Sequence, residues 1–377
     1  MKIATRSLRA ILPTGVLAAV ALLLATSGSA SAFGFSHAVF VQTDNPAGNQ
    51  VAVYDRAPNG SLTPAGSYAT GGLGGVLAGS VVDHLASQGS LTYDRADGLL
   101  FAVNAGSDTI SVFAVYGDRL ALRQVIGSGG EFPVSVDERN GLVYVLNAEG
   151  GGSVAGYRVT FGRLLPIPGS VRALGLDPAA TPQFTHTPGE VAFTPDGSQL
   201  LVTTKENGSA VDVFRVGPFG LLSHAPVVNS LPGAVPFAVS FAGRDELVLA
   251  EAGTDALATF VLGHGGTLTQ LGTAGTGQAA TCWVVGSDGR FYASNAGSAS
   301  LSDFALGAAG ALTLFETTPT DAGTTDAAAP GDGRFLYVRA GAAGIVDAFA
   351  IEPGGTLVKV GSVTVPGAVG GEGIAAE

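Results

Sequence analysis

Short runs of alternating apolar and small or polar residues recur along this chain with a period of about 45 residues, which is typical of a solenoid or propeller. The clearest copies begin at Ser90, Val134 and Val191, and weaker copies begin at Val239, Val284 and Ala328. Hairpin signals such as Asp97-Gly98 and Asp196-Gly197 break each copy into short strands. Each copy therefore predicts four antiparallel strands, which is what one propeller blade contains.

The two ends of the chain complete this pattern. The copy that begins at Val39 lacks its opening strand, whereas residues 373–377 look like the start of a further copy with nothing after it. We expect this tail to supply the innermost strand of the first blade, because pairing the two ends removes a free sheet edge. The predicted fold class is all-β: a seven-bladed β-propeller of four-stranded antiparallel blades, closed by the C-terminal strand.

The N-terminus has the features of a secretory signal peptide. Lys2, Arg6 and Arg9 precede an apolar stretch from 11 to 25, and Ala30-Ser31-Ala32 offers a small-residue cleavage site. The apolar stretch is about 15 residues, short of the roughly 20 that a spanning helix needs. We expect a signal peptide at 1–32, a single propeller domain at 33–377, and a secreted or cell-envelope protein without membrane insertion after cleavage. An uncleaved anchor is the alternative.

Charge and cysteine content narrow the partners. The formal net charge is -12, and without residues 1–32 the chain has 15 basic against 30 acidic residues. This balance argues against nucleic acid or an anionic membrane surface, which favour basic patches. The single cysteine, Cys282, excludes an intramolecular disulfide. We expect a monomer whose partner is a small-molecule ligand.

Propeller geometry also predicts where candidate site residues gather. Ends of second strands and starts of first strands lie around the same mouth of the ring, which we call the top face. The polar, aromatic or thiol residues at these positions are Gln88, Asn104, Asn147, Glu190, Lys205, Glu251, Cys282, Trp283, Asn295, Asp326 and Arg339. Since burying many unpaired polar groups is costly, they predict a shared, hydrated funnel for a ligand.

Several of these residues have a structural alternative. Asn104 and Asn295 occur in Asn-Ala-Gly, where an asparagine can serve a turn. Cys282 and Trp283 could pack between blades, although an indole at the mouth of the ring is also a ligand platform. His84 and His186 lie in long links on the top face, where a histidine can act as a base near neutral pH or be an ordinary loop residue.

Motifs for other chemistries are missing from the sequence. There is no His-Glu-x-x-His, no paired-cysteine zinc spacing, no Gly-x-Ser-x-Gly and no phosphate-binding loop. We expect no cofactor. A calcium-like divalent cation is the alternative, because Glu190, Glu251 and Asp326 offer oxygen ligands around the ring.

The repeat residues resemble a known family. Ala-Phe-Thr-Pro-Asp-Gly (192–197), Leu-Phe-Ala-Val-Asn-Ala-Gly (100–106) and Ile-Ser-Val-Phe (110–113) are similar to the lactonase-type seven-bladed propellers, which include propeller 6-phosphogluconolactonases and 3-carboxymuconate cyclase-like proteins. Residues 86–90, 133–136, 236–237 and 282–283 resemble an exported subgroup. The family's Gly-Pro-Arg-His element has no match here, because Glu190 stands where a basic residue is expected. A carboxylate there disfavours a sugar phosphate as substrate.

The resemblance implies an exported, lactonase-like protein that binds a small organic ligand in the top funnel and hydrolyses or forms a lactone ring. In this hypothesis Glu190 or His186 moves a proton, Lys205 and Arg339 stabilise the oxyanion, and Glu251 orients one of them. The expected ligand-binding residues are Gln88, Asn104, Asn147, Trp283, Asn295 and Arg339. The alternative is a non-catalytic binding or scaffold propeller at the cell surface, since fold alone does not establish activity.

Overall fold

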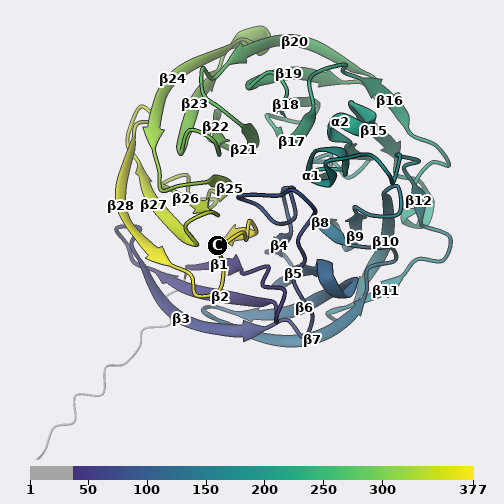
Figure 1. Cartoon of the computed structure of the whole chain (residues 1–377), viewed down its shortest axis with the longest axis horizontal. Helices are drawn as coiled ribbons and strands as arrows, with labels where there is room; N and C mark the ends of the chain where they lie inside the picture. The colour runs from purple at the N-terminus through teal and green to yellow at the C-terminus, as the bar shows by residue number, and fades with distance from the viewer. Residues whose placement is uncertain (1–36) are drawn as a thin grey trace, which may run out of the picture. The chain divides into compact units, whose positions relative to one another are not determined.

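Seven antiparallel sheets surround a common axis like the blades of a propeller in residues 37–377, the part of the chain that this computed structural model describes (Figure 1). Six sheets have four strands, and the third blade has a short fifth. This arrangement confirms the predicted seven-bladed, all-β fold. The predicted signal peptide at 1–32 lies outside the described residues and stays a prediction.

The blades follow one another in chain order, each written here from its innermost strand outward. Blade 1 contains β29 (Ile374–Ala376), β1 (Ala38–Gln42), β2 (Gln50–Arg56) and β3 (Leu62–Ala69); blade 2 contains β4 (Leu91–Asp94), β5 (Leu99–Asn104), β6 (Thr109–Tyr116) and β7 (Arg119–Gly127); blade 3 contains β8 (Pro133–Arg139), β9 (Leu142–Asn147), β10 (Ser153–Thr160) and β11 (Arg163–Pro166), with β12 (Arg172–Ala173) also beside β10. Blade 4 contains β13 (Val191–Phe193), β14 (Gln199–Thr203), β15 (Ala210–Arg215) and β16 (Val227–Ser230); blade 5 contains β17 (Pro236–Phe241), β18 (Glu246–Glu251), β19 (Ala256–Leu262) and β20 (Leu268–Gly275). Blade 6 contains β21 (Thr281–Ser287), β22 (Arg290–Asn295), β23 (Ser300–Leu306) and β24 (Leu312–Pro319); blade 7 contains β25 (Thr324–Ala328), β26 (Phe335–Ala340), β27 (Ile345–Ile351) and β28 (Leu357–Thr364).

The C-terminal strand closes the ring. β29 pairs antiparallel with β1, with Ile374 opposite Val41 and Ala376 opposite Val39. β1 in turn pairs with β2, so the first blade is built from both ends of the chain. The predicted closure is confirmed, and β1 has a neighbour on each side.

The hydrophobic core lies between blades. All six residues of β5 are buried, whereas exposed and covered residues alternate along most of the outermost strand β7. Phe40 of blade 1 and Leu100 and Phe113 of blade 2 belong to one buried cluster. Because each fully buried side chain of this kind contributes about 1.5–3 kcal/mol, face-to-face packing of neighbouring blades holds the ring together.

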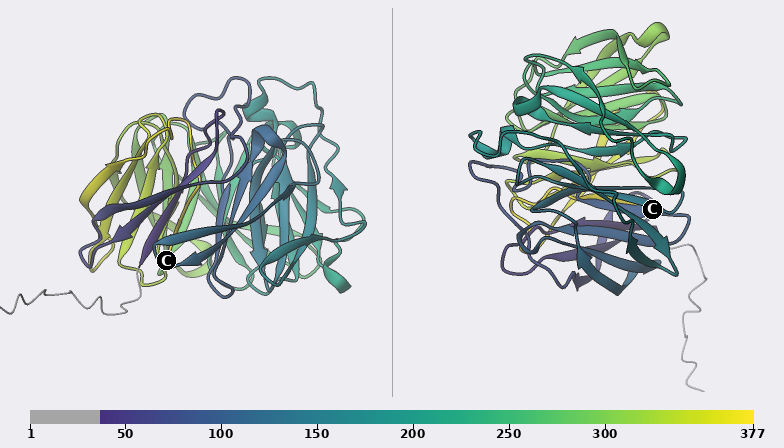
Figure 2. Two further views of the ribbon diagram at one scale, coloured as in Figure 1. Left: turned by 90° about the horizontal axis from the view of Figure 1, so that it is seen from below. Right: turned by 90° about the vertical axis from the view of Figure 1, so that its right-hand side faces the viewer.

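Two long links lie on the top face. The first link, residues 70–90, joins blade 1 to blade 2, and the second link, residues 167–190, joins blade 3 to blade 4 and contains α1 (Gln183–His186). A second one-turn helix, α2 (Lys205–Gly208), follows β14, and three 3-10 turns are η1 (Ala105–Ser107), η2 (Pro218–Gly220) and η3 (Ala308–Gly310). Figure 2 shows the links rising from one face, whereas the opposite, bottom face carries short hairpins. In residues 37–377, no helix has the length and apolar character to cross a membrane.

Candidate functional site

The end of the first link, just before blade 2, crosses the ring and contacts the inner strand of blade 6. The Trp283 indole Nε1 donates to the Ser87 carbonyl at 2.6 Å. The Gln88 side chain pairs with the backbone of Val284 in both directions, since its Nε2 donates to the carbonyl at 3.1 Å and its Oε1 accepts from the amide at 3.0 Å. These contacts fix the first link over the middle of the ring, where Figure 1 shows it.

Lys205 at the start of α2 ties the two links together. Its Nζ donates to the carbonyls of Ala86 at 2.7 Å and Phe184 at 2.6 Å, and to Thr187 Oγ1 at 3.2 Å. An ammonium group has three donors, and these contacts use all of them. Lys205 is only 1% exposed, and burial lowers its pKa to about 7 while the nearby Asp83 acts in the opposite direction. The side chain therefore clamps the two links onto blade 4.

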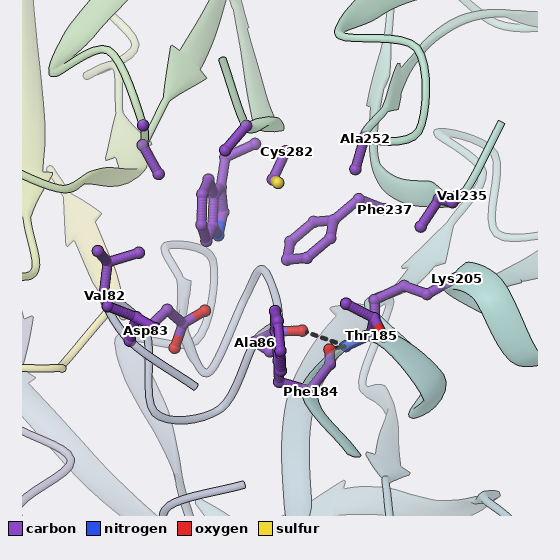
Figure 3. Close-up of a pocket in the computed structure, with 15 residues that line it drawn as sticks. Val82, Asp83, Ala86, Phe184, Thr185, Lys205, Val235, Phe237, Ala252 and Cys282 are labelled. Carbon is purple, nitrogen blue, oxygen red and sulfur yellow. Dashed lines mark hydrogen bonds between the residues drawn. The ribbon is translucent and has the colours of Figure 1, made fainter. Parts of the chain in front are cut away.

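A cavity of about 310 Å³ lies beside this clamp, between the two links and blades 4 to 6 (Figure 3). An edge-to-face pair forms part of its wall, with the rings of Phe237 and Trp283 4.9 Å apart and inclined at 61°. The other lining residues are mostly apolar or small: Val81, Val82, Asp83, Ala86, Phe184, Thr185, Lys205, Val235, Ala252, Ala280, Cys282, Ala296 and Gly297. A cavity with these walls suits a small apolar molecule.

Asp83 brings a carboxyl group to the cavity wall. Its Oδ1 accepts the Leu85 amide at 2.8 Å and its Oδ2 accepts the Ser87 amide at 2.9 Å, so the side chain is fixed to its own link. Figure 3 shows the group pointing from the first link toward the cavity interior. Asp83 is 3% exposed, and burial raises its pKa to about 7. It is therefore suited to accept a proton near neutral pH.

Cys282 also lines the cavity but is a poor nucleophile. Burial raises the pKa of its thiol to about 12, although the nearby charge of Lys205 lowers it in part. Since the thiolate is the reactive form, the thiol stays neutral and unreactive at physiological pH. Cys282 contributes volume and a soft surface to the wall.

Glu190 and Gln88 come together as the sequence analysis expects them to, but beneath the cavity rather than in its wall. Gln88 Nε2 donates to Glu190 Oε1 at 3.3 Å, and the Val239 amide donates to Glu190 Oε2. Burial raises the pKa of Glu190 well above its ordinary value. These contacts connect the first link with blades 4 and 5, and neither residue lines the cavity.

The three candidate asparagines are fully buried within the sheets. Asn104 Nδ2 donates to Ser111 Oγ at 2.8 Å and to Thr109 Oγ1 at 3.1 Å. Asn295 makes the equivalent contacts to two serines of β23, and Asn147 Nδ2 donates to the Ser128 carbonyl at 3.3 Å. Their hydrogen bonds stabilise the ends of second strands, and the structure does not bring them to the cavity. Their role in ligand binding stays a prediction.

His186 and Glu251 also lie away from the cavity wall. His186 Nδ1 is 2.9 Å from the Pro182 carbonyl, and its ring borders a separate hollow of about 110 Å³ at the second link. Glu251 is 7% exposed and accepts from Thr254 Oγ1 at 3.3 Å, and burial raises its pKa. In residues 37–377 neither side chain is hydrogen bonded to Lys205, whose partners are Ala86, Phe184 and Thr187. Their catalytic role stays a prediction.

Arg339 belongs to the closure side of the ring, which we define by Asp44, Asp326, Arg339 and Glu372. Arg339 Nη2 donates to the carbonyls of Ala368 at 3.0 Å and Gly371 at 2.8 Å. The Glu372 amide donates to Asp44 Oδ2 at 3.1 Å. All four side chains are less than 5% exposed, so this group forms a buried polar layer beside the closing strand.

The top of the ring therefore differs from the expected hydrated funnel. Most of the polar residues predicted to line it are buried and hydrogen bonded within the sheets or to the two links. Among residues 37–377, no group of three or more histidine, cysteine and carboxylate side chains is arranged to hold a metal ion. Of the predicted residues, Lys205, Cys282 and Trp283 line the cavity, whereas Gln88 and Glu190 support it from below.

Asp83 and Phe237 are the two wall residues of most chemical interest that are not candidates on sequence grounds. His84, next to Asp83, is the more obvious base, and Phe237 falls at an ordinary inner-strand position. A signal for Asp83 is its place in a long link within an apolar stretch, Val81-Val82-Asp83. A buried carboxylate is uncommon without a structural or chemical reason.

Comparisons with known proteins identify the family to which this propeller belongs. A family model for the seven-bladed β-propeller lactonases matches residues 82–370. A periplasmic gluconolactonase from Pseudomonas aeruginosa superposes with a TM-score of 0.72 at 21% identity, over 90% of this chain and 98% of that chain. A proposed 6-phosphogluconolactonase from Bacteroides fragilis gives 0.71 at 18% identity, over 91% and 98%. No curated protein sequence matches the chain. At these identities the structural likeness shows the fold alone, whereas the family model covers most of the sequence, and the chain therefore belongs to the lactonase family of seven-bladed β-propellers.

Proposed function

We propose that this protein binds a small, apolar, uncharged lactone in the cavity on its top face and hydrolyses the ring. The observation that carries this proposal is the wall itself: the Phe237–Trp283 pair and small apolar residues surround one carboxyl group, Asp83. Aromatic and aliphatic walls favour an apolar ring, and membership of the lactonase family supports an ester in that ring.

The charges around the cavity disfavour an anionic substrate. Recognition of a phosphate or carboxylate uses cationic side chains with free donors. Lys205 directs its three donors to protein acceptors, and Arg339 is buried on the closure side and does not line the cavity. Asp83 would also repel an anion once it is ionised. The substrate class that fits is a neutral aliphatic or aromatic lactone rather than a sugar phosphate.

Asp83 has the position and the pKa of a general base. In the proposed reaction the ionised carboxylate takes a proton from water, and the water oxygen bonds to the lactone carbonyl carbon. The ring carbon–oxygen bond then breaks, and the leaving alkoxide receives the proton, which gives a hydroxy acid. The positive charge of Lys205 in the same wall favours the developing oxyanion, as the sequence analysis expects of this residue.

A non-catalytic binding protein is the second candidate, and a specific observation favours it. The Trp283 indole and the Lys205 ammonium both donate their hydrogen bonds to carbonyl oxygens of the links. Neither keeps a free donor for a carbonyl oxygen of the substrate. Without such a donor, binding without turnover is the expected behaviour.

We also propose that the protein acts outside the cytoplasm as a monomer. The basic, apolar and small-residue pattern of residues 1–32 supports export. One structural neighbour is named a periplasmic gluconolactonase, which agrees with such a location.

The chain offers a direct test, because Trp283 is its single tryptophan and lines the cavity. Fluorescence titration measures binding of a lactone panel, and proton release measures hydrolysis of the same compounds. We expect apolar lactones to change the fluorescence and to be hydrolysed, with a rate that rises toward about pH 7 as Asp83 ionises and falls above it as Lys205 loses its proton. Binding without proton release would support the second candidate, and no fluorescence change with any lactone would contradict both.

Asp83→Asn isolates the proposed base. We expect hydrolysis to fall at least about 100-fold while the fluorescence titration is retained. Asp137→Asn is the matched control, because Asp137 is also a carboxylate that accepts two backbone amides and has its pKa raised by burial, yet it lies outside the cavity. Equal losses in the two variants would assign the effect to folding and contradict the role of Asp83.

A further inference from the structure

The hairpins that join third and fourth strands on the bottom face differ around the ring. In blades 2, 3 and 4 they carry an exposed aromatic residue: Tyr116 at 58%, Phe161 at 101% and Phe219 at 85% exposure. The equivalent hairpins of the other four blades have small or polar residues at 58–60, 263–266, 308–310 and 353–355. Three neighbouring blades therefore expose aromatic residues at one edge of the bottom face. Figure 2 shows this face opposite to the links.

Local turn geometry does not call for these rings. Phe161 has φ 51° and Gly162 has φ 71° in a two-residue hairpin that connects Thr160 with Arg163. Asparagine and glycine are the residues that suit such a turn, whereas a phenylalanine there is strained. The Phe161 side chain is fully exposed and its backbone is strained, so this residue does not stabilise the fold. We infer that the ring contacts another molecule.

Blade 6 supplies an internal comparison for Phe219. The turns at 217–221 and 307–311 have the same form: a glycine, a one-turn 3-10 segment and a glycine at positive φ. Phe219 has φ 63° and its equivalent Ala309 has φ 57°. The same turn therefore forms with a methyl group in place of the benzyl group, so the Phe219 ring is not needed to fold it.

Arginines surround the same three hairpins. The outer two strands of blades 2 to 4 and their hairpins carry five exposed arginines: Arg119, Arg123, Arg158, Arg163 and Arg215. Their acidic residues are Asp118 and the buried Asp212. The same segments of the other blades carry exposed or half-exposed acids at Asp55, Glu316 and Glu352, against the exposed Lys359 and the buried Arg56. An acidic protein thus has a local basic edge where its exposed rings lie.

Charged residues of both signs lie nearer the axis on the bottom face. Asp97 and Asp196 lie between first and second strands and Glu138 lies near the end of β8, while the exposed Arg95 and Arg139 lie beside them. On the outer strands and hairpins of blades 2 to 4, the five arginines outnumber Asp118 and the buried Asp212. The excess of basic residues therefore lies at the outer edge of these three blades.

We propose that this edge, defined by Tyr116, Phe161, Phe219 and the five arginines, docks on an anionic lipid surface, although the net charge of -12 by itself argues against such a partner. Aromatic rings at the tips of loops enter the boundary between headgroups and acyl chains, and exposed arginines bind lipid phosphates. Opposite charge selects this occupant over a neutral surface. Docked in this way, the protein keeps its top face and cavity turned away from the lipid.

Vesicle sedimentation of the purified protein tests the proposal. The probes are phosphatidylcholine vesicles with and without about one third phosphatidylglycerol, at low and physiological salt. We expect binding to the anionic vesicles, weakened by salt because exposed charges are screened. The double variant Phe161→Asn, Phe219→Ala should bind at least about tenfold more weakly, with an unchanged melting temperature, because both replacements suit their turns.

Two further variants complete the test. Arg158→Gln with Arg163→Gln should weaken binding and reduce its salt dependence. Phe315→Ala is the matched control, since Phe315 is an exposed aromatic residue of β24 in blade 6, 4.1 Å from the Arg290 guanidinium, and it should change nothing. All variants share residues 1–36, so these residues cannot cause a difference in binding between them. Equal binding by the wild type and the double variant would overturn the proposal. Concentration-dependent dimerisation that is lost in the double variant would also overturn it, because a second copy would then be the occupant.

Discussion

The cavity side of the ring, formed by blades 4 to 6, and the closure side lie around the same axis but differ in composition. The first is mostly apolar, and the second is mostly charged. On the cavity side, Phe237, Trp283 and small apolar residues enclose open space next to the clamp at Lys205. On the closure side, Asp44, Asp326, Arg339 and Glu372 are buried and packed together beside β29. The cavity side leaves space for a ligand, and the closure side joins the two ends of the chain.

This difference separates function from stability within a repeated fold. Blades 4 to 6 can vary their wall residues without touching the seam that closes the ring. The first link contacts both sides, because Ser87 Oγ and the Ser90 amide donate to Glu372 Oε1. The closure side has little freedom, because each buried charge needs its partners and loss of one partner leaves an uncompensated charge. Changes on the closure side should therefore alter melting, and changes on the cavity side should alter ligand binding.

The largest effect is expected from removing residues 373–377. The deletion removes the pairing of β29 with β1 and the burial of Ile374, and it leaves β1 as a free edge. We expect the melting temperature to fall by roughly 10 °C, as measured by calorimetry. Deleting Glu377 alone is the control, because it removes one backbone hydrogen bond, to Ala38. A melt that is unchanged in the longer deletion would contradict the role of the closure side.

A smaller effect is expected from Lys205→Met, which removes the hydrogen bonds that hold the two links on the cavity side. Methionine keeps the length of the side chain but leaves the carbonyls of Ala86 and Phe184 without their donor, at a cost of about 2 kcal/mol. We expect faster proteolysis within the second link and weaker ligand binding by Trp283 fluorescence. Arg244→Met, an exposed substitution, should change neither measurement. Normal protection of the second link would show that Lys205 does not clamp it.

A further effect, on the stability of the whole ring, is expected from pH. Burial raises the pKa of Asp83 and of Asp326 to about 7 and also raises that of Glu372. The unfolded chain loses these protons near pH 4, whereas the folded protein keeps them to about pH 7, so stability falls as pH rises between about 4 and 7. Lys205, whose pKa burial lowers to about 7, acts in the opposite direction only above that pH. Melting temperatures at pH 5 and 7 check this, and a higher value at pH 7 would contradict it.

Sequence periodicity predicted the seven blades and their closure because both follow from local signals: alternating strands, Asp-Gly turns and an incomplete first copy. The cavity wall was harder to predict. In blades 5 and 6 the inner strand has a register shift between Pro236 and Ala238 and between Thr281 and Trp283. Such a bulge changes which side chains face the ring, so Phe237 could not be placed from alternation alone.

The predicted polar funnel illustrates a second limit. Asn104 and Asn295 recur at the same place in their blades because each bonds neighbouring hydroxyl groups, and recurrence of that kind reflects the repeat itself. Lys205 departs from this pattern and does reach the cavity wall. Asp83 lies in one of the two long links, which are not part of the repeated unit, so no periodic argument could identify it.

The closing strand also sets the order in which the ring can be completed. β1 is among the first strands to be synthesised, yet its inner neighbour β29 is made last. Until residues 374–376 emerge, Val39, Phe40 and Val41 keep an open edge that another nascent chain could pair with. The first blade to be made is therefore the last to be finished, and the time between these two events is when the chain most needs protection from its neighbours.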